Sequence, residues 1–189
     1  MQENAPEQLK ISENSCNLHT NCYIIKLIYY MLIGENMNGG HIMSYRPAIN
    51  IASEIIRGYG EQGTGITNLK LQKVMYYADM MFLKERGEPL IIEDFEAWRH
   101  GPVIPEVYNI FKMYVSDPIS LRDRNLETVE LDANERDVIN RIVDRTISID
   151  AWDLVQLTHA TDPWIDNYVP GCNFTIPKSE IRVNGDINI

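Results

Sequence analysis

Two polar residues stand inside a long, largely apolar stretch of the chain. Gln72 and Lys73 fall in the second turn of a helix that the pattern predicts over residues 68–86. Apolar residues occupy most of its other positions, which is typical of a buried helix that neighbouring elements surround. A buried amide or ammonium group needs partners, because an unpaired polar group in a protein interior is costly. Either both side chains reach the surface along their stems, or other segments supply their hydrogen bonds.

The histidines are the other candidates for chemistry. His100 and His159 are the only histidines after residue 43. Neither belongs to an H-E-x-x-H pattern, and no Cys–His or Ser–His–Asp arrangement is readable. A histidine beside a turn more often makes structural hydrogen bonds. We therefore predict no catalytic residue, no metal site and no cofactor, and we keep as an alternative a hydrolase that uses His100, His159 and a carboxylate.

The composition argues against several classes of protein. The 189 residues are 44% hydrophobic, which is enough to form the core of one domain. A formal net charge of −10 argues against tight binding to nucleic acid, which basic surfaces drive. Cys16, Cys22 and Cys172 show no C-x-x-C spacing, so neither a disulfide framework nor a zinc site is expected. We expect a cytoplasmic protein that binds neither membranes nor nucleic acid.

Residues 1–42 differ in character from the rest of the chain. The apolar run at residues 22–33 is too short to cross a bilayer and contains Lys26. Its residue types have A/T-rich codons, and Gly39-Gly40 lies where a ribosome-binding sequence would precede a start codon for Met43. We expect residues 1–42 to be either a mis-annotated or a disordered N-terminal extension. The domain is then residues 43–189.

Helical spacing dominates this domain. The expected helices are residues 47–57, residues 68–86, and four that begin at Pro105, Asp132, Asp150 and Pro177. Residues 95–98 fit either an extended segment or a helical turn, and a small hairpin is considered in residues 119–131. The predicted fold is mainly α: a compact single-domain bundle of about six helices around a central buried helix, with or without a short β-hairpin.

Three segments together resemble the Panacea antitoxin domain, the SocA-like family. They are LKLQKVMYYA at residues 69–78, EAWRHGPVIPEVY at residues 96–108, and Leu157-Thr158-His159 with Pro163-Trp164. Each segment is a modest signal alone, but their order and spacing are specific, and the resemblance covers residues 45–182. The motif residues are Leu71, Gln72, Lys73, Tyr76, Tyr77, Trp98, His100, Gly101, Pro102, Val103, Tyr108, Thr158, His159, Pro163 and Trp164.

The resemblance implies a function. Its members neutralise a protein toxin encoded beside them by direct contact, so the implied partner is a cognate toxin. Some relatives act as adaptors that hand the toxin to a protease, and a proteolytic adaptor that meets an ATP-dependent protease is therefore the second hypothesis. The family is not known for catalysis, which agrees with the prediction that this chain is not an enzyme.

We hypothesise that the three segments meet in space. Gln72 and Lys73 would then find their partners in the turn at residues 98–100 and in Thr158-His159, forming a structural cluster rather than a catalytic site. The motif does not indicate the toxin-binding surface, which we expect elsewhere or at the edge of this cluster. Candidates for part of it are the acidic residues after the central helix, Glu85, Glu88, Glu93 and Asp94.

Overall fold

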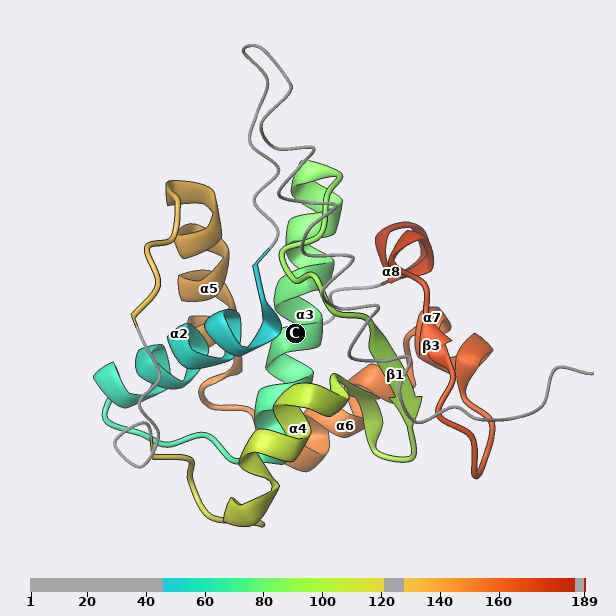
Figure 1. The fold of residues 1–189 in the computed structure, drawn as a ribbon, viewed down its shortest axis with the longest axis horizontal. Helices are drawn as coiled ribbons and strands as arrows, with labels where there is room; N and C mark the ends of the chain where they lie inside the picture. Colours follow the sequence, from blue (N-terminus) through green and yellow to red (C-terminus); the bar gives the residue numbers. More distant parts are fainter. Residues whose placement is uncertain (1–45, 121–127, 186–188) are drawn as a thin grey trace, which may run out of the picture. The chain divides into compact units, whose positions relative to one another are not determined.

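One long helix lies at the centre of the domain (Figure 1). The computed structural model describes residues 46–120, 128–185 and 189. The central helix, α3 (Asn68–Arg86), has the bounds that the sequence predicts. It begins at Thr67, whose Oγ1 accepts a hydrogen bond from the Lys70 backbone N–H at 3.3 Å. It ends at Gly87, which has a φ of 78°, a conformation that glycine adopts without steric cost.

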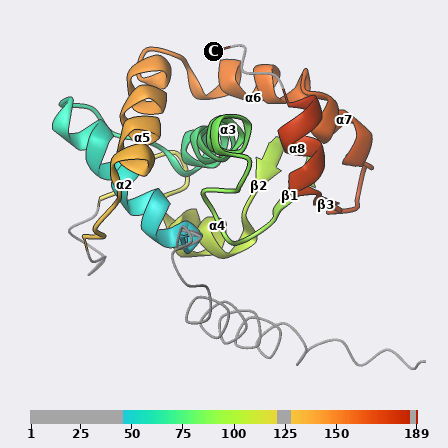
Figure 2. The same cartoon turned by 90° about the horizontal axis from the view of Figure 1, so that it is seen from above.

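The other helices surround α3. They are α2 (Ala48–Glu61), α4 (Pro105–Phe111), α5 (Ala133–Thr146), α6 (Ala151–His159), α7 (Asp162–Asn167) and α8 (Lys178–Asn184), with a 3₁₀ turn, η1 (Lys112–Tyr114), after α4. α3 contacts α2, α4, α5, α6 and α8, and it is buried without interruption from Leu71 to Leu83. Figure 2 looks along α3 and shows α2 and α5 on one side and α7 and α8 on the other. The described residues therefore form a mainly α fold around a central buried helix, as predicted.

The described residues contain seven α-helices, against about six predicted. The additional helix is the short α7. Pro163 follows the end of α6, and it also stands in the first turn of α7. The first N–H groups of a helix have no acceptor within it, so a proline there loses no hydrogen bond. A proline that stops one helix can therefore help to start the next.

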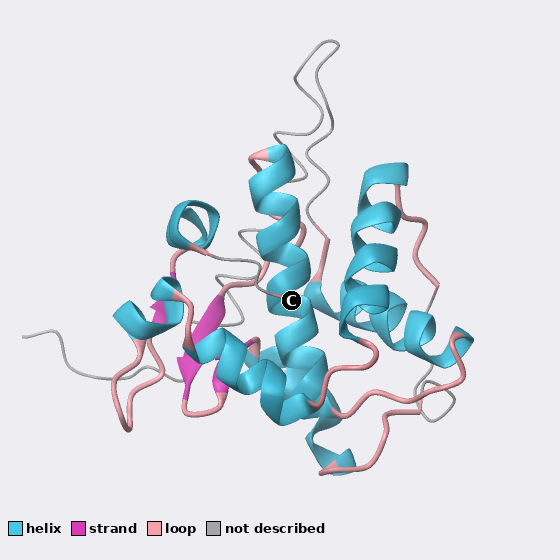
Figure 3. Cartoon of the chain, turned by 180° about the vertical axis from the view of Figure 1, so that it is seen from behind, coloured by secondary structure: helices cyan, strands magenta, loops and turns pink. Residues whose placement is uncertain are grey.

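A small antiparallel sheet lies beside α3 (Figure 3). Its strands are β1 (Phe95–Trp98), β2 (Gly101–Val103) and β3 (Thr175–Ile176), in the order β2-β1-β3. β1 and β2 form a hairpin in which Trp98 is opposite Gly101, so the extended alternative for residues 95–98 is the correct one. The hairpin considered in residues 119–131 falls partly on residues 121–127, which lie outside the described residues, and the described residues on either side form no strand.

Both acidic helix starts form as predicted. The Asp132 carboxylate accepts from the Glu135 N–H at 2.9 Å, and the Glu135 carboxylate accepts from the Asp132 N–H at 2.8 Å, which completes a capping box. Asp150 caps α6 by accepting from the Trp152 N–H at 2.8 Å. Glu135 also accepts two hydrogen bonds from the Arg46 guanidinium, at 2.7 and 2.9 Å. This bidentate pair fixes the beginning of the described chain to α5.

Asp79 is a buried carboxylate in the middle of α3. Its Oδ1 accepts from the backbone N–H groups of Leu90 and Ile91 at 2.8 and 3.0 Å. Its Oδ2 lies 2.6 Å from Lys178 Nζ. A buried charge is tolerated when it is paired and hydrogen-bonded, and here the pairing ties α8 and the segment after α3 to the central helix.

The expectation for residues 1–42 concerns residues that lie outside the described ones. Within residues 46–120 and 128–185, no helix combines the length and the apolar character needed to cross a bilayer.

Candidate functional site

Lys73 is fully buried in α3. Its Nζ donates a hydrogen bond to the Pro102 carbonyl oxygen at 2.8 Å. Among the described residues, no carboxylate lies within ion-pair distance of this nitrogen. Burial lowers the pKa of Lys73 from 10.5 to about 7, because removal of water disfavours the ammonium form. Lys73 is therefore an amine whose charge state changes near neutral pH.

The three motif segments meet at Gly101. This glycine has a φ of 90°, which side-chain-bearing residues rarely adopt. A Cβ atom built on it would lie 2.6 Å from Thr158 Oγ1 and 2.9 Å from Lys73 Cε. The turn between β1 and β2 thus packs directly between α3 and α6, and only a residue without a side chain fits there.

Gln72 links α3 to the chain that follows β2. Its Oε1 accepts from the Ile104 backbone N–H at 2.9 Å, and its Nε2 donates to Asn68 Oδ1 at 3.2 Å. The Asn68 amide in turn donates to the Tyr108 carbonyl oxygen at 3.2 Å. The partners of Gln72 and Lys73 are therefore backbone groups of residues 102 and 104 and the Asn68 side chain. The predicted hydrogen bonds to the turn at residues 98–100 and to Thr158-His159 do not form: Thr158 Oγ1 instead donates to the Val155 carbonyl oxygen at 2.9 Å.

Trp164 is the more buried of the two motif tryptophans, with 9% of its surface exposed. Its indole Nε1 donates to the Trp98 carbonyl oxygen at 3.0 Å, which joins α7 to β1. Its ring stacks on His159 at 3.9 Å between centroids and on Tyr168 at 4.5 Å. Trp98 itself is half-buried: its indole donates to the Glu96 carboxylate at 2.7 Å, and its ring meets Tyr108 edge-on at 5.0 Å.

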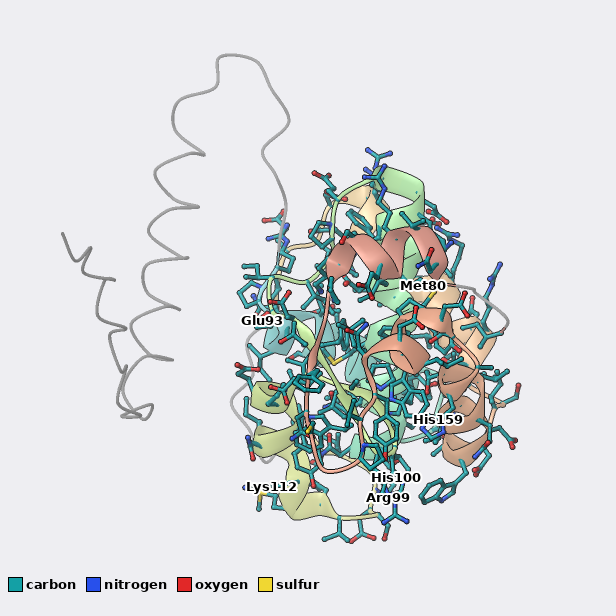
Figure 4. All side chains as sticks on the ribbon, turned by 90° about the vertical axis from the view of Figure 1, so that its right-hand side faces the viewer. Met80, Glu93, Arg99, His100, Lys112 and His159 are labelled. Carbon is teal, nitrogen blue, oxygen red and sulfur yellow. The ribbon has the colours of Figure 1, made fainter. Side chains whose placement is uncertain are left out.

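The two histidines have different environments. His100 is exposed, and its ring meets the Trp152 ring edge-on at 5.2 Å. His159 is half-buried, and its Nε2 is buried without a hydrogen-bond partner among the described residues. Burial lowers the pKa of His159, the charges of Lys73 and His100 lower it further, and a hydrogen bond with the Arg99 backbone opposes them. Figure 4 labels both histidines and Arg99 in the same region of the domain.

The other motif residues are placed in or beside the core. Tyr76 is buried, with its ring edge-on to Phe95 at 5.2 Å and its hydroxyl 3.5 Å from Thr161 Oγ1. Leu71, Tyr77, Val103 and Pro163 are buried as well. These positions belong to the packing around α3, and none of them offers a reactive group to solvent.

A pocket of about 410 Å³ opens beside Lys73. Its lining brings together the first turns of α3, the turn between β1 and β2, α4 with η1 and the residue after it, and the start of α6. The lining residues are Asn68, Leu69, Gln72, Lys73, Trp98, Arg99, His100, Val103, Tyr108, Lys112, Val115 and Trp152. Four of them carry basic side chains, and none carries a carboxylate. A second pocket of about 500 Å³ shares Trp98 and Arg99 with it and continues to residues 168–173.

The acidic residues considered for the toxin surface include two that are bonded to other elements of the domain. The Glu85 carboxylate receives two hydrogen bonds from the Arg141 guanidinium, at 2.8 and 2.7 Å. Glu93 is half-buried and accepts from the Ala48 backbone N–H at 2.7 Å, and burial raises its pKa. Of the four, only Asp94 and Glu85 are exposed. Among the described residues, no group of three His, Cys, Asp or Glu side chains is arranged to hold a metal ion.

Comparison with known proteins identifies the family. Residues 71–165 match the family described as Antitoxin SocA-like, Panacea domain. The chain belongs to the SocA-like Panacea family. The match includes all fifteen motif residues, and it confirms the resemblance that the three segments indicate.

A curated relative supports the same assignment. This Panacea chain is 34% identical over 109 residues to Antitoxin SocA of Caulobacter vibrioides (strain NA1000 / CB15N). The aligned part covers 52% of this chain and 58% of that protein, so the similarity spans less than two thirds of the relative's length. No solved structure matches the Panacea chain.

Proposed function

We propose that this Panacea chain is an antitoxin that neutralises a protein toxin by direct, stoichiometric binding. The family match carries the proposal, since the family is named for an antitoxin and the similar protein from Caulobacter vibrioides bears that name. The pocket beside Lys73 supports it, because all three family segments contribute to the pocket or to the packing behind it.

The rim of this pocket has the character of a protein-binding surface. Val115 and Trp152 line the pocket with 80% and 54% of their surfaces exposed, and Met113 nearby is 66% exposed. Large apolar side chains in this position are typical of contacts with another protein, where aromatic residues contribute most of the binding energy. We infer that the toxin covers this rim.

The test is co-expression with the adjacent gene in a bacterial host. The neighbour alone should stop growth, both genes together should restore it, and the two proteins should co-purify. The test variant is Trp152→Ala at the rim of the pocket. The control is Arg136→Ala, which removes an exposed side chain from α5, away from the pocket. The first should weaken rescue and the second should not. Growth restored without any complex would contradict direct binding.

A proteolytic adaptor is the second candidate, because a second group of exposed apolar side chains exists. Ile165, Val169 and Phe174, on α7 and the segment after it, are 52%, 45% and 53% exposed. An adaptor needs one surface for the toxin and another for an unfoldase. If toxin disappears in the presence of this chain only when the host carries its ATP-dependent protease, the adaptor mechanism applies. Turnover of a substrate by the purified chain would instead support the hydrolase hypothesis.

A further inference from the structure

The pocket beside Lys73 has the opposite charge from the rest of the chain. Lys73, Arg99, His100 and Lys112 line it, and no Asp or Glu does. The whole chain, in contrast, has 27 acidic residues against 17 Lys and Arg residues. A basic pocket in an acidic protein favours an anionic group at one defined place.

The hydrogen bonding of Lys73 leaves donors that such a group could use. An ammonium group has three N–H donors, and among the described residues the Lys73 group has one acceptor, the Pro102 carbonyl oxygen. A fully buried ammonium that lacks a counter-ion is costly, and the cost falls when an anion with oxygen acceptors binds to it. Gln72 and Asn68 also line the pocket, but their side-chain amides bond to each other and to the backbone.

The mouth of the pocket also offers apolar surface to a ligand. Trp98, Tyr108 and Trp152 contribute aromatic surface, and Val115 projects at the rim. Val115 has a φ of 51°, a backbone conformation that is strained for a β-branched residue. Strained backbone of this kind is concentrated at ligand-binding sites, where the surrounding structure holds it in place. A volume of about 410 Å³ has room for one or two side chains.

We propose that this pocket binds a carboxylate side chain and an adjacent apolar side chain from one segment of the partner protein, with the carboxylate paired to Lys73. The proposal rests on the antitoxin function, since it defines what the toxin must offer. A free inorganic anion fits less well, because it would leave Val115 and Trp152 exposed. The toxin segment would cover both residues and neutralise the buried charge in a single contact.

The first experiment needs no toxin. The ¹⁵N-labelled full chain is titrated by NMR with acetyl-Leu-Glu-Leu-amide, with acetyl-Leu-Gln-Leu-amide and with inorganic phosphate, while the indole signals of Trp98 and Trp152 are followed. The Glu peptide should shift both signals and bind at least tenfold more tightly than the Gln peptide. Equal binding of the two peptides, no shift at millimolar Glu peptide, or tighter binding of phosphate would overturn the proposal.

Two variants on the same helix make this test specific. Lys73→Met keeps the length of the side chain and should abolish the preference for Glu over Gln. Lys70→Met removes the same charge one helical turn before Lys73, at a position outside the pocket. It should keep the preference for Glu over Gln. Preserved discrimination in Lys73→Met would overturn the pairing with Lys73.

The pH dependence gives a second readout. The affinity for the Glu peptide should fall as the pH rises above about 7, because Lys73 then loses its proton. The titratable or charged groups that line the pocket with Lys73 are Arg99 and His100 from the turn and Tyr108 and Lys112 from α4 and η1. The charge of Lys73 also acts on His159 of α6. A His100→Gln variant should keep the decrease above pH 7, and Lys73→Met should lose it. A decrease that persists in Lys73→Met would contradict the assignment. If the Glu peptide binds but this chain does not restore growth in cells, the pocket proposal is supported and the antitoxin function is rejected.

Discussion

Lys73 Nζ lies 2.8 Å from the carbonyl oxygen of Pro102, and this contact joins the central helix to the hairpin through a fully buried amine. The contact supplies one acceptor to a group that carries three donors when protonated. The folded protein therefore holds Lys73 more readily as a neutral amine than the unfolded chain does. This difference makes stability depend on pH.

Replacement of Lys73 by Met should stabilise the free protein and flatten its pH profile. The pKa of Lys73 is about 7 in the folded state and near 10.5 in the unfolded chain, so the unfolded state binds more protons between these values. The free energy of unfolding of the wild type should therefore rise by up to about 1.4 kcal/mol per pH unit above pH 7. Urea denaturation between pH 7 and 9.5 measures this. Equal slopes in wild type and Lys73→Met would show that Lys73 stays protonated in the fold.

The rise in stability with pH should end near pH 10, because two buried tyrosines then act in the opposite direction. Burial raises the pKa values of Tyr59 and Tyr76 from 10 to about 12. Above pH 10 both tyrosines ionise more readily in the unfolded chain, so they lower stability and oppose the effect of Lys73. Lys84→Met is the control, since it removes the same charge from an exposed position in the last turn of the same helix.

Replacement of Gly101 by Ala should destabilise the domain more than the same change at Gly87. Both glycines have positive φ, at 90° and 78°. A Cβ atom at Gly101 meets Thr158 and Lys73, whereas a Cβ atom at Gly87 meets nothing within 4 Å. We expect about 1 kcal/mol for Gly87→Ala from backbone strain and at least about 3 kcal/mol for Gly101→Ala from strain and overpacking together. Chemical denaturation gives both values, and equal losses would exclude the close packing at Gly101.

Replacement of Trp164 by Ala should cost more stability than replacement of Trp98. Trp164 is 9% exposed and stacks between His159 and Tyr168, so its loss should cost about 3–5 kcal/mol. Trp98 is half-buried at the pocket, and its loss should affect stability less and toxin binding more. His159→Ala should lower the free energy of unfolding by about 1–3 kcal/mol. The change removes the ring that stacks on Trp164 and the hydrogen-bond partner of the Arg99 backbone. The prediction is wrong if Trp98→Ala is the most destabilising of the three in urea.

Association with a toxin of basic net charge should slow as salt is added. The chain has a formal net charge of −10, and a protein of this charge attracts a basic partner over long distances. Stopped-flow mixing at increasing NaCl concentrations measures the association rate, with sucrose as a control for viscosity. A rate that is independent of salt would exclude electrostatic steering.

The sequence predicts the fold better than it predicts the site. The bounds of α3 follow from Thr67, Gly87 and the continuous apolar pattern, because each acts locally. The capping box at Asp132 is a local signal as well. α7 is not predicted because a proline such as Pro163 cannot continue a helix, although the same residue suits the first turn of a new one.

The polar contacts are harder to predict because they join distant residues. Asp79 is separated from Lys178 by 99 positions, and nothing near Asp79 in the sequence distinguishes it from a surface acid. The motif correctly brings Lys73, Gly101 and Thr158 together, but it does not indicate that Lys73 bonds to a backbone oxygen. Trp98 and Trp164 also look equivalent in the sequence, and only the packing of α7 shows which of them is buried.

Stoichiometry tests the central proposal most directly. The chain and the product of the adjacent gene are co-expressed, purified through a tag on the toxin, and analysed by size-exclusion chromatography with light scattering. Direct neutralisation predicts a complex of fixed molar ratio, and growth that recovers only when this chain reaches that ratio to the toxin. Recovery at a small fraction of that ratio, with no complex on the column, would contradict neutralisation by binding.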